Sequence, residues 1–196
     1  MKIIVITGPS GSGKTKLSNE IARHIGNTII IQTDSYYRDD LFIKLLSIFQ
    51  NDIYDRLISI KDYEVKKTIT SILNRCEYTT FYKYDFTRRK STKSKRKIQN
   101  KNSLRYIILE GIFSHRLNLN YKKTINIVCE EEKELCYKRR ISRDQAERGR
   151  TKYEIIKRFN KSWDLFLNNI NYFINNNKVI LINPSKITCY KKLINN

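Results

Sequence analysis

The chain has 196 residues, of which 39 are Lys or Arg and 19 are Asp or Glu, and its formal net charge is +20 at pH 7. This length can bury one hydrophobic core but is too short for two ordinary domains, so we expect a single domain over residues 1–196. No apolar run approaches membrane-span length, and the first strand-like run leaves no room for a signal peptide. We expect a cytoplasmic protein, or one inside an organelle if it is organelle-encoded, without a membrane partner.

The excess of positive charge has two interpretations. A basic surface attracts polyanions such as nucleic acids and nucleotides. The chain is also rich in Lys, Ile and Asn, which a compositional bias of the coding sequence would produce without a selected surface. We favour the second interpretation and do not expect a nucleic acid to be the main partner. The four cysteines are scattered and only two histidines are present, so no zinc site or disulfide framework is indicated.

Five short apolar runs predict the strands of a parallel sheet that is buried on both faces, with helical stretches between most of them. These strands are Lys2–Thr7, Thr28–Gln32, Arg105–Leu109, Thr124–Cys129 and Lys178–Ile182. The expected fold class is therefore α/β, with helices flanking the sheet. Open sheets of this kind bind ligands at the carboxyl ends of their strands, so polar residues that follow the strands are the candidates for chemistry.

A glycine-rich phosphate loop follows the first strand directly, with the sequence Gly8-Pro9-Ser10-Gly11-Ser12-Gly13-Lys14-Thr15. It matches G-x-x-x-x-G-K-[ST], in which glycines let backbone N–H groups point into one concavity that holds phosphate oxygens. Lys14 adds a charge for the β- and γ-phosphates, and Thr15 places a hydroxyl where Mg²⁺ would sit. The loop predicts a site for the phosphates of ATP or GTP together with Mg²⁺.

Two carboxylates follow later strands of the predicted sheet. Asp34 comes shortly after the second strand, and Glu110 comes directly after the third. Both should therefore converge with the phosphate loop at one edge of the sheet. The structural alternative for Glu110 is a carboxylate that only caps a strand or helix end.

A long insertion, residues 39–102, separates the second and third predicted strands. Helical periodicity covers residues 41–49 and 62–73. Residues 77–86 are dense in Tyr, Thr and Phe, which predicts a small β-hairpin or flap that could carry a substrate pocket. Residues 88–101 are strongly basic, with Ser and Thr between the cations, and we expect a mobile, solvated loop. That loop could contact a polyanion, although surface solubility is the favoured interpretation.

The segment 130–150 predicts an arginine-rich helical lid. It begins with acidic residues, as a helix N-terminus should, and ends in Arg148-Gly149-Arg150. Because Arg binds phosphate through two parallel hydrogen bonds, several guanidiniums on one side of a helix suit a triphosphate. The structural alternative for part of this cluster is a local pair between Asp144 and Arg148, which are four residues apart.

Taken in order, these segments resemble the uridine kinase family of P-loop kinases over nearly the whole chain. Thr33-Asp34-Ser35-Tyr36-Tyr37 is similar to the family's D-S-F-Y element, Tyr84-Asp85-Phe86 to its Y-D-F element, and Leu109-Glu110-Gly111-Ile112 to its L-E-G-I strand end. Arg139-Arg140-Ile141-Ser142-Arg143-Asp144 with Arg148-Gly149-Arg150 follows R-R-x-x-R-D-x-x-x-R-G-R position by position. The resemblance implies a P-loop kinase fold with five parallel strands.

The resemblance also implies a role for each matching residue. Asp34 would be the catalytic carboxylate, with Lys14 and Arg143 stabilising the transition state. Mg²⁺ would lie near Thr15, Glu110 and Asp34. The phosphate donor would contact residues 8–15 and the lid residues Arg140, Arg148 and Arg150. The nucleoside would contact Asp55 through its ribose and Tyr84 and Phe86 through its base, and the further acceptor-site residues would be Arg89, Arg140, Arg150 and Arg158.

The acceptor half of the site departs from the family pattern. Asp55 lacks the His and Pro that follow it in the family's N-[FYW]-D-H-P segment, because Arg56 and Leu57 stand there. Arg89 stands where the family has a base-contacting His, and Arg158 where it has a base-contacting Gln. Two arginines could donate to a pyrimidine, or they could bind an anionic acceptor, as in the related phosphoribulokinase branch.

We therefore expect transfer of the γ-phosphoryl group of ATP or GTP to the 5′-hydroxyl of uridine or cytidine. One alternative is a kinase of another small alcohol, such as a sugar phosphate. Another is a basic nucleic-acid-binding protein whose phosphate loop is a vestige. The family resemblance further implies a homo-oligomer, commonly a tetramer.

Overall fold

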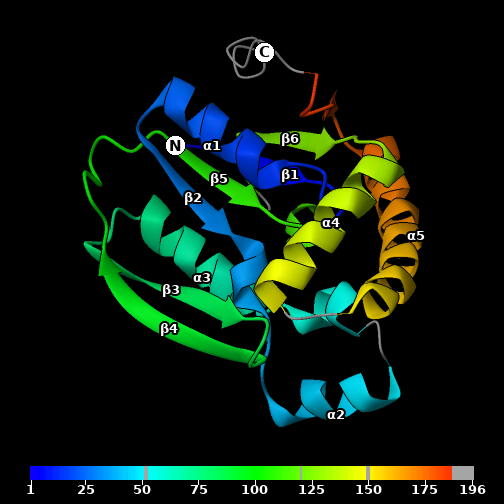
Figure 1. The fold of residues 1–196 in the computed structure, drawn as a ribbon. Helices are drawn as coiled ribbons and strands as arrows, with labels where there is room; N and C mark the ends of the chain where they lie inside the picture. Colours follow the sequence, from blue (N-terminus) through cyan, green and yellow to red (C-terminus); the bar gives the residue numbers. More distant parts are fainter. Residues whose placement is uncertain (51–52, 120, 149–150, 187–196) are drawn as a thin grey trace.

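The computed structural model describes residues 1–196 except 51–52, 120, 149–150 and 187–196, and the side chains of Asp55 and Arg148 are also not described. The described chain forms a five-stranded parallel sheet flanked by helices (Figure 1). The order across the sheet is β2 (Thr28–Gln32), β5 (Tyr106–Glu110), β1 (Lys2–Thr7), β6 (Thr124–Cys129) and β7 (Val179–Ile182). The predicted fold class and all five predicted strands are confirmed, with β5 shifted by one residue so that Glu110 ends it.

The central strand β1 is buried on both faces, which is why its sequence is a continuous β-branched run. Ile3 and Val5 belong to one apolar cluster, and Ile4 and Ile6 belong to another on the opposite face. Side chains alternate along a strand, so each face receives every second residue. The sheet therefore has a core on each side, and its polar loops lie at the strand ends.

The helices cover these two faces. Helix α1 (Lys14–Ile25) contributes Leu17 and Ile21 to one core, and α3 (Asp62–Leu73) contributes Val65 and Ile69 to the other. Helix α4 (Lys133–Arg148) and the long α5 (Lys152–Asn176) lie together beside β6 and β7 (Figure 1). None of the helices within the described ranges combines the length and apolar character that a bilayer crossing requires.

The insertion between β2 and β5 contains helices and a hairpin. Helix α2 (Leu41–Phe49) lies apart from the sheet and exposes apolar side chains, of which Leu41, Ile48 and Phe49 are 78, 71 and 86% accessible (Figure 1). Short 3₁₀ turns form η1 (Thr33–Tyr36), η2 (Ile53–Asp55), η3 (Leu57–Ser59) and, after β5, η4 (Ser114–Arg116).

The basic segment is a strand, which corrects the loop expected there. Strand β3 (Tyr78–Asp85) pairs antiparallel along its whole length with β4 (Lys90–Lys97). The carboxylate of Asp85 accepts hydrogen bonds from the backbone N–H groups of Thr87 and Arg88, both at 2.9 Å, which closes the turn. Ser and Thr between the lysines are compatible with a strand, and the exposed position of β4 lets its charges stay in water. The hairpin thus spans residues 78–97 and is not confined to 77–86.

Candidate active site

The phosphate loop lies between β1 and α1 with its backbone tightly curled. Gly11 and Gly13 have φ angles of 89° and 88°, a region that side chains with a Cβ rarely adopt. A Cβ on Gly11 would lie 2.3 Å from the carbonyl oxygen of Cys136 on α4, so glycine also permits close contact with the lid. The hydroxyl of Ser12 is buried and has no hydrogen-bond partner among the described residues. A phosphate oxygen in the concavity would give this hydroxyl a partner.

Lys14 is buried at the start of α1, where only 7% of its surface is accessible. Its Nζ donates a hydrogen bond to the carbonyl oxygen of Pro9 at 3.0 Å, across the mouth of the loop. The ammonium group is therefore held at the loop and close to the N-terminal dipole of α1, which also favours anions.

The carboxylates after β2 and β5 converge with the loop, as the sequence predicted. Thr15 Oγ1 donates to Glu110 Oε1 at 3.1 Å. Asp34 Oδ1, on η1, accepts a hydrogen bond from the backbone N–H of Ile112 at 3.1 Å. Mg²⁺ usually binds one or two carboxylates and completes its shell with water and phosphate oxygens. Thr15, Glu110 and Asp34 supply a donor set of that kind, so the residues present fit the ion.

Gly111 makes this convergence possible. A Cβ at that position would lie 2.0 Å from Thr33 Oγ1 and 2.7 Å from Asp34 Oδ1. Thr33 Oγ1 in turn lies within 3.2 Å of the carbonyl oxygen of Glu110. The end of β5 and the start of η1 therefore touch directly, and no larger residue would fit between the two carboxylates.

The electrostatics of Glu110 follow from its position. Burial raises the pKa of Glu110 above its ordinary value, and the negative charge of Asp34 acts in the same direction. Lys14 and the hydrogen bond from Thr15 oppose this shift. A buried carboxylate whose ionisation is opposed by a neighbouring carboxylate forms a site that favours a cation.

The lid arginines reach the phosphate loop from α4. Arg143 Nη2 donates to Ser10 Oγ at 3.1 Å, and Arg139 Nη1 donates to the carbonyl oxygen of Gly11 at 3.2 Å. Arg140 Nη1 donates to Ser162 Oγ on α5 at 2.6 Å, and its guanidinium lies over the ring of Phe159. Arg150 and the side chain of Arg148 lie outside the described part of the chain. The lid therefore brings Arg143 to the loop, while Arg140 is held between α4 and α5.

Asp144 organises this cluster in a way that the sequence analysis missed. It is completely buried, its Oδ1 accepts from Arg143 at 3.0 and 2.8 Å, and its Oδ2 lies 3.7 Å from Arg140. The alternative considered for Asp144 was a pair with Arg148, four residues later, whose side chain is outside the described part of the chain. Because Asp144 follows Arg143 directly and lies one turn after Arg140, one carboxylate can orient both guanidiniums. The spacing of Arg140 and Asp144 was a usable signal.

The expected base-binding residues Tyr84 and Phe86 form an aromatic cluster with Tyr37 and Tyr54. The ring centroids of Tyr84 and Phe86 are 5.0 Å apart, and Tyr37 lies 5.4 Å from Tyr84. Burial raises the pKa of Tyr84, and the nearby charge of Arg89 lowers it in part. The charge of Arg89 therefore acts on Tyr84, while a contact of Arg89 with an acceptor stays a prediction. The sequence analysis did not foresee Tyr37 and Tyr54 as packing partners.

For two expected acceptor residues, Asp55 and Arg158, the structure gives the position in the fold. The backbone of Asp55 belongs to η2, directly after Tyr54 of the aromatic cluster, while its side chain is not described. Arg158 is half-buried on α5, one residue before Phe159. Their contacts with an acceptor stay predictions.

His115 is a further residue near the loop that the sequence did not indicate. Its Nδ1 lies 3.0 Å from the hydroxyl of Thr7, the last residue of β1. It lines a small pocket with Ser10, Arg140 and Trp163. Burial lowers the pKa of His115 to about 4, and the charge of Arg116 adds to the shift. The ring is therefore neutral at physiological pH.

Comparisons with known proteins agree with this geometry. The sequence profile of the phosphoribulokinase/uridine kinase family matches residues 3–185. The uridine kinase of Streptococcus equi subsp. zooepidemicus is 29% identical over 160 residues, which are 80% of this chain and 74% of that protein. The uridine kinase of Shewanella baltica is 29% identical over 167 residues, 82% of this chain and 76% of that protein. A Silicibacter protein described as a fructose transport system kinase has the same fold, with a TM-score of 0.65 at 14% identity, over 85% of this chain and 84% of that one.

Proposed function

Because the chain belongs to the phosphoribulokinase/uridine kinase family, we propose that it transfers the γ-phosphoryl group of ATP or GTP to the 5′-hydroxyl of uridine or cytidine. The observation that carries this proposal is the convergence of two carboxylates beside the phosphate loop. Glu110, at the end of β5, accepts a hydrogen bond from Thr15 of the loop, and Asp34, on η1 after β2, accepts one from the backbone N–H of Ile112, two residues after Glu110. The uridine kinases that resemble this chain over about four fifths of its length support the choice of acceptor.

The residues suit phosphoryl transfer because that reaction needs positioning and charge neutralisation more than covalent chemistry. The loop amides and Lys14 hold the phosphates of the donor. Asp34, oriented by the N–H of Ile112, accepts a hydrogen bond from the acceptor hydroxyl and takes its proton. Arg143 compensates the negative charge that develops on the transferred group. Thr15, Glu110 and Asp34 would hold Mg²⁺, which supplies positive charge at the phosphate oxygens when bound.

A panel of acceptors tests the proposed substrate. The purified protein is incubated with ATP labelled in its γ-phosphate and with uridine, cytidine, purine nucleosides or pentose phosphates. We expect label on uridine or cytidine. Label on purine nucleosides alone, or no transfer to any acceptor, would contradict the proposal.

One observation favours a second candidate, a kinase of an anionic small alcohol such as a sugar phosphate. The charge of Arg89 opposes part of the rise in the pKa of the Tyr84 hydroxyl, and Arg158 lies on the helix that follows the lid. Two guanidiniums near the acceptor would suit a phosphate group. In the same panel, label on a pentose phosphate and not on uridine or cytidine would establish this alternative.

A further inference from the structure

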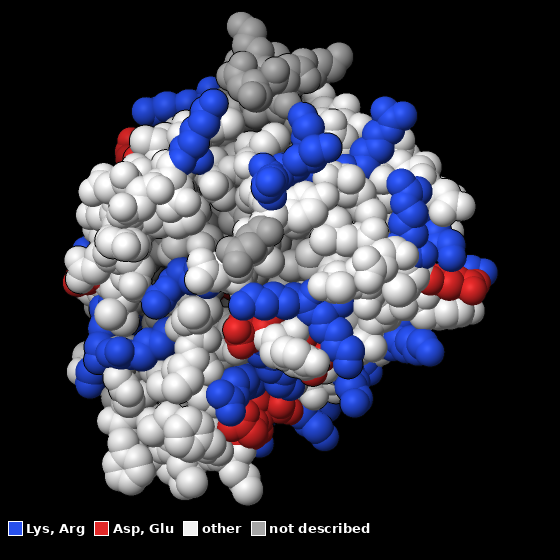
Figure 2. All heavy atoms as spheres, turned by 180° about the vertical axis from the view of Figure 1, so that it is seen from behind, with Lys and Arg blue, Asp and Glu red and all other residues white. Residues whose placement is uncertain are grey.

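The hairpin carries a concentration of positive charge that the kinase mechanism does not use. Strand β4 has the sequence KSTKSKRK, in which five of eight residues are Lys or Arg. Residues 86–109 contain no Asp or Glu. Figure 2 shows Lys and Arg spread over the rear face of the molecule, as a general compositional bias would produce. A bias of that kind does not explain why cations are concentrated and carboxylates absent in one segment.

This charge is presented on an ordered strand. Every residue of β4 is exposed except Ser91, which is half-buried. The hairpin is anchored to the core because Thr68 Oγ1 donates to the carbonyl oxygen of Thr80 at 2.9 Å, and the N–H of Ser91 donates to Asp39 at 2.9 Å. Residues two apart on one face of an antiparallel strand are about 6.8 Å apart. Lys93, Lys95 and Lys97 therefore stand at regular intervals on one face of β4, while Lys90 and Arg96 lie on the other face.

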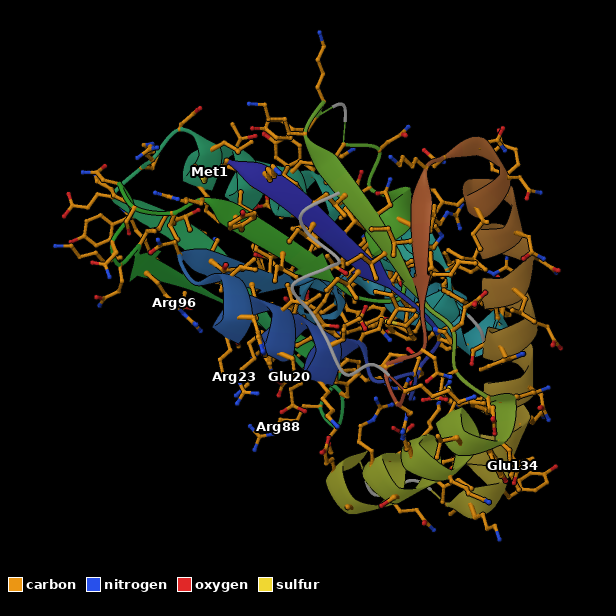
Figure 3. The ribbon with its side chains drawn as sticks, turned by 90° about the horizontal axis from the view of Figure 1, so that it is seen from above. Met1, Glu20, Arg23, Arg88, Arg96 and Glu134 are labelled. Atoms are coloured by element: carbon orange, nitrogen blue, oxygen red, sulfur yellow. The ribbon has the colours of Figure 1, made fainter. Side chains whose placement is uncertain are left out.

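Most of these charges have no carboxylate beside them. In the described part of the chain, the ion pair found on β4 joins Lys97 to Glu77 at 3.1 Å. Lys95 lies over the ring of Tyr78, with 5.4 Å from Nζ to the ring centroid, and Arg96 lies over Phe81 at 5.6 Å. Such contacts hold the stems of the side chains while their charged ends stay in water. Arg96 points away from the body of the protein, as does Arg88 at the turn (Figure 3).

We propose that the hairpin binds the phosphate backbone of a nucleic acid, without sequence preference. A nucleic-acid strand offers closely spaced negative charges, one per about 3.4 Å of axis for each strand of a duplex, which a row of lysines at regular intervals can neutralise. Exposed aromatic rings beside the cations, as at Tyr78, also suit bases. The exposed side chains of β4 are Lys, Arg, Ser and Thr, without the aliphatic groups that would insert into a lipid surface. This binding is independent of the proposed kinase activity.

Fluorescence anisotropy with labelled single-stranded RNA and DNA of about 20 nucleotides tests the proposal. The hairpin variant carries Lys93→Thr, Lys95→Thr and Arg96→Thr, which keep strand propensity. The matched control carries Lys122→Gln, Lys123→Gln and Lys178→Gln, which remove the same charge from exposed positions just before β6 and β7. We expect the hairpin variant to bind at least about tenfold more weakly and to lower the slope of log K against log salt by about 2 to 3. The control variant should lose much less affinity for the oligonucleotides.

Three results would overturn the proposal: no binding of either oligonucleotide by the unaltered protein at low salt, equal losses in both variants, or binding to phosphatidylserine vesicles without binding to oligonucleotides. Similar affinity for RNA and DNA is expected from backbone recognition, and a strong preference for one sequence would contradict it. Phosphate transfer is measured on both variants. It should stay unchanged, so a failure of the nucleic-acid proposal is distinguishable from a failure of the kinase proposal.

Discussion

Single residues define the chemistry of the site through contacts that few other side chains could make. Gly111 lets Glu110 and Asp34 approach each other, and a Cβ there would overlap Thr33. Asp34 is oriented by a hydrogen bond from the backbone N–H of Ile112. A carboxylate held in this way keeps its direction when the neighbouring side chains move to bind substrate.

The ring of His115 should make the stability of the protein depend on pH. Its pKa is about 4 in the folded protein, against 6.5 for an ordinary histidine, because the ring is buried. Between these values the unfolded chain binds more protons than the folded one, so the free energy of unfolding falls as pH decreases from about 7 to 4. The full effect is roughly 3 kcal/mol. Urea unfolding at pH 7.5 and pH 4.5 measures it.

His115→Phe keeps a ring in the same pocket and removes the titrating group. The variant should lose stability less steeply between those two pH values than the unaltered protein. His24→Phe, at an exposed position on α1, is the control. An unchanged pH dependence in His115→Phe would show that His115 is not buried in its neutral form.

Among the elements, α4 illustrates how the lid is held over the phosphate loop. Asp144 is fully buried and contacts Arg140 and Arg143, whose side chains are 7 and 34% accessible. One buried carboxylate between two guanidiniums positions Arg143 toward Ser10. The lid therefore depends on a residue that does not itself contact the phosphates.

Asp144→Asn should lower both stability and phosphate transfer. Removing one partner of a buried ion pair leaves the other charge uncompensated, which costs about 3 kcal/mol. Arg143 would also lose its orientation, so we expect kcat to fall by about tenfold or more. Urea unfolding and steady-state kinetics with ATP measure the two effects.

Asp164→Asn is the matched control for that substitution, because Asp164 is exposed on α5. It should leave stability and kcat nearly unchanged. A fully stable Asp144→Asn protein with normal kcat would show that the buried carboxylate does not position the lid.

At the scale of the whole molecule, the sequence predicted the sheet and the phosphate loop closely. The five strands are short apolar runs rich in β-branched residues, and the loop matches the pattern G-x-x-x-x-G-K-[ST]. The convergence of Asp34 and Glu110 followed from the general placement of ligands at strand ends. These features are determined by local sequence patterns, so they do not depend on how the surface segments pack against one another.

The features that the sequence did not reveal depend on packing between distant segments. Strand β4 lacks apolar alternation, so its pairing with β3 could not be read from periodicity. The contacts of Tyr37 and Tyr54 with Tyr84 join residues about 30 to 47 positions apart. The contact of Asp144 with Arg140 was not singled out, because Arg140 and Arg148 both lie four residues from Asp144 on the helix.

We propose that Asp34 is the carboxylate that activates the acceptor hydroxyl, and its replacement by asparagine tests this role. We compare kcat for phosphate transfer to the best acceptor in Asp34→Asn and in the unaltered protein, with Asp62→Asn, an exposed position on α3, as the control. Asparagine keeps the size of the side chain but cannot take a proton. We predict that kcat falls at least about 100-fold in Asp34→Asn and is unchanged in Asp62→Asn. An Asp34→Asn protein with the kcat of the unaltered protein would contradict the account.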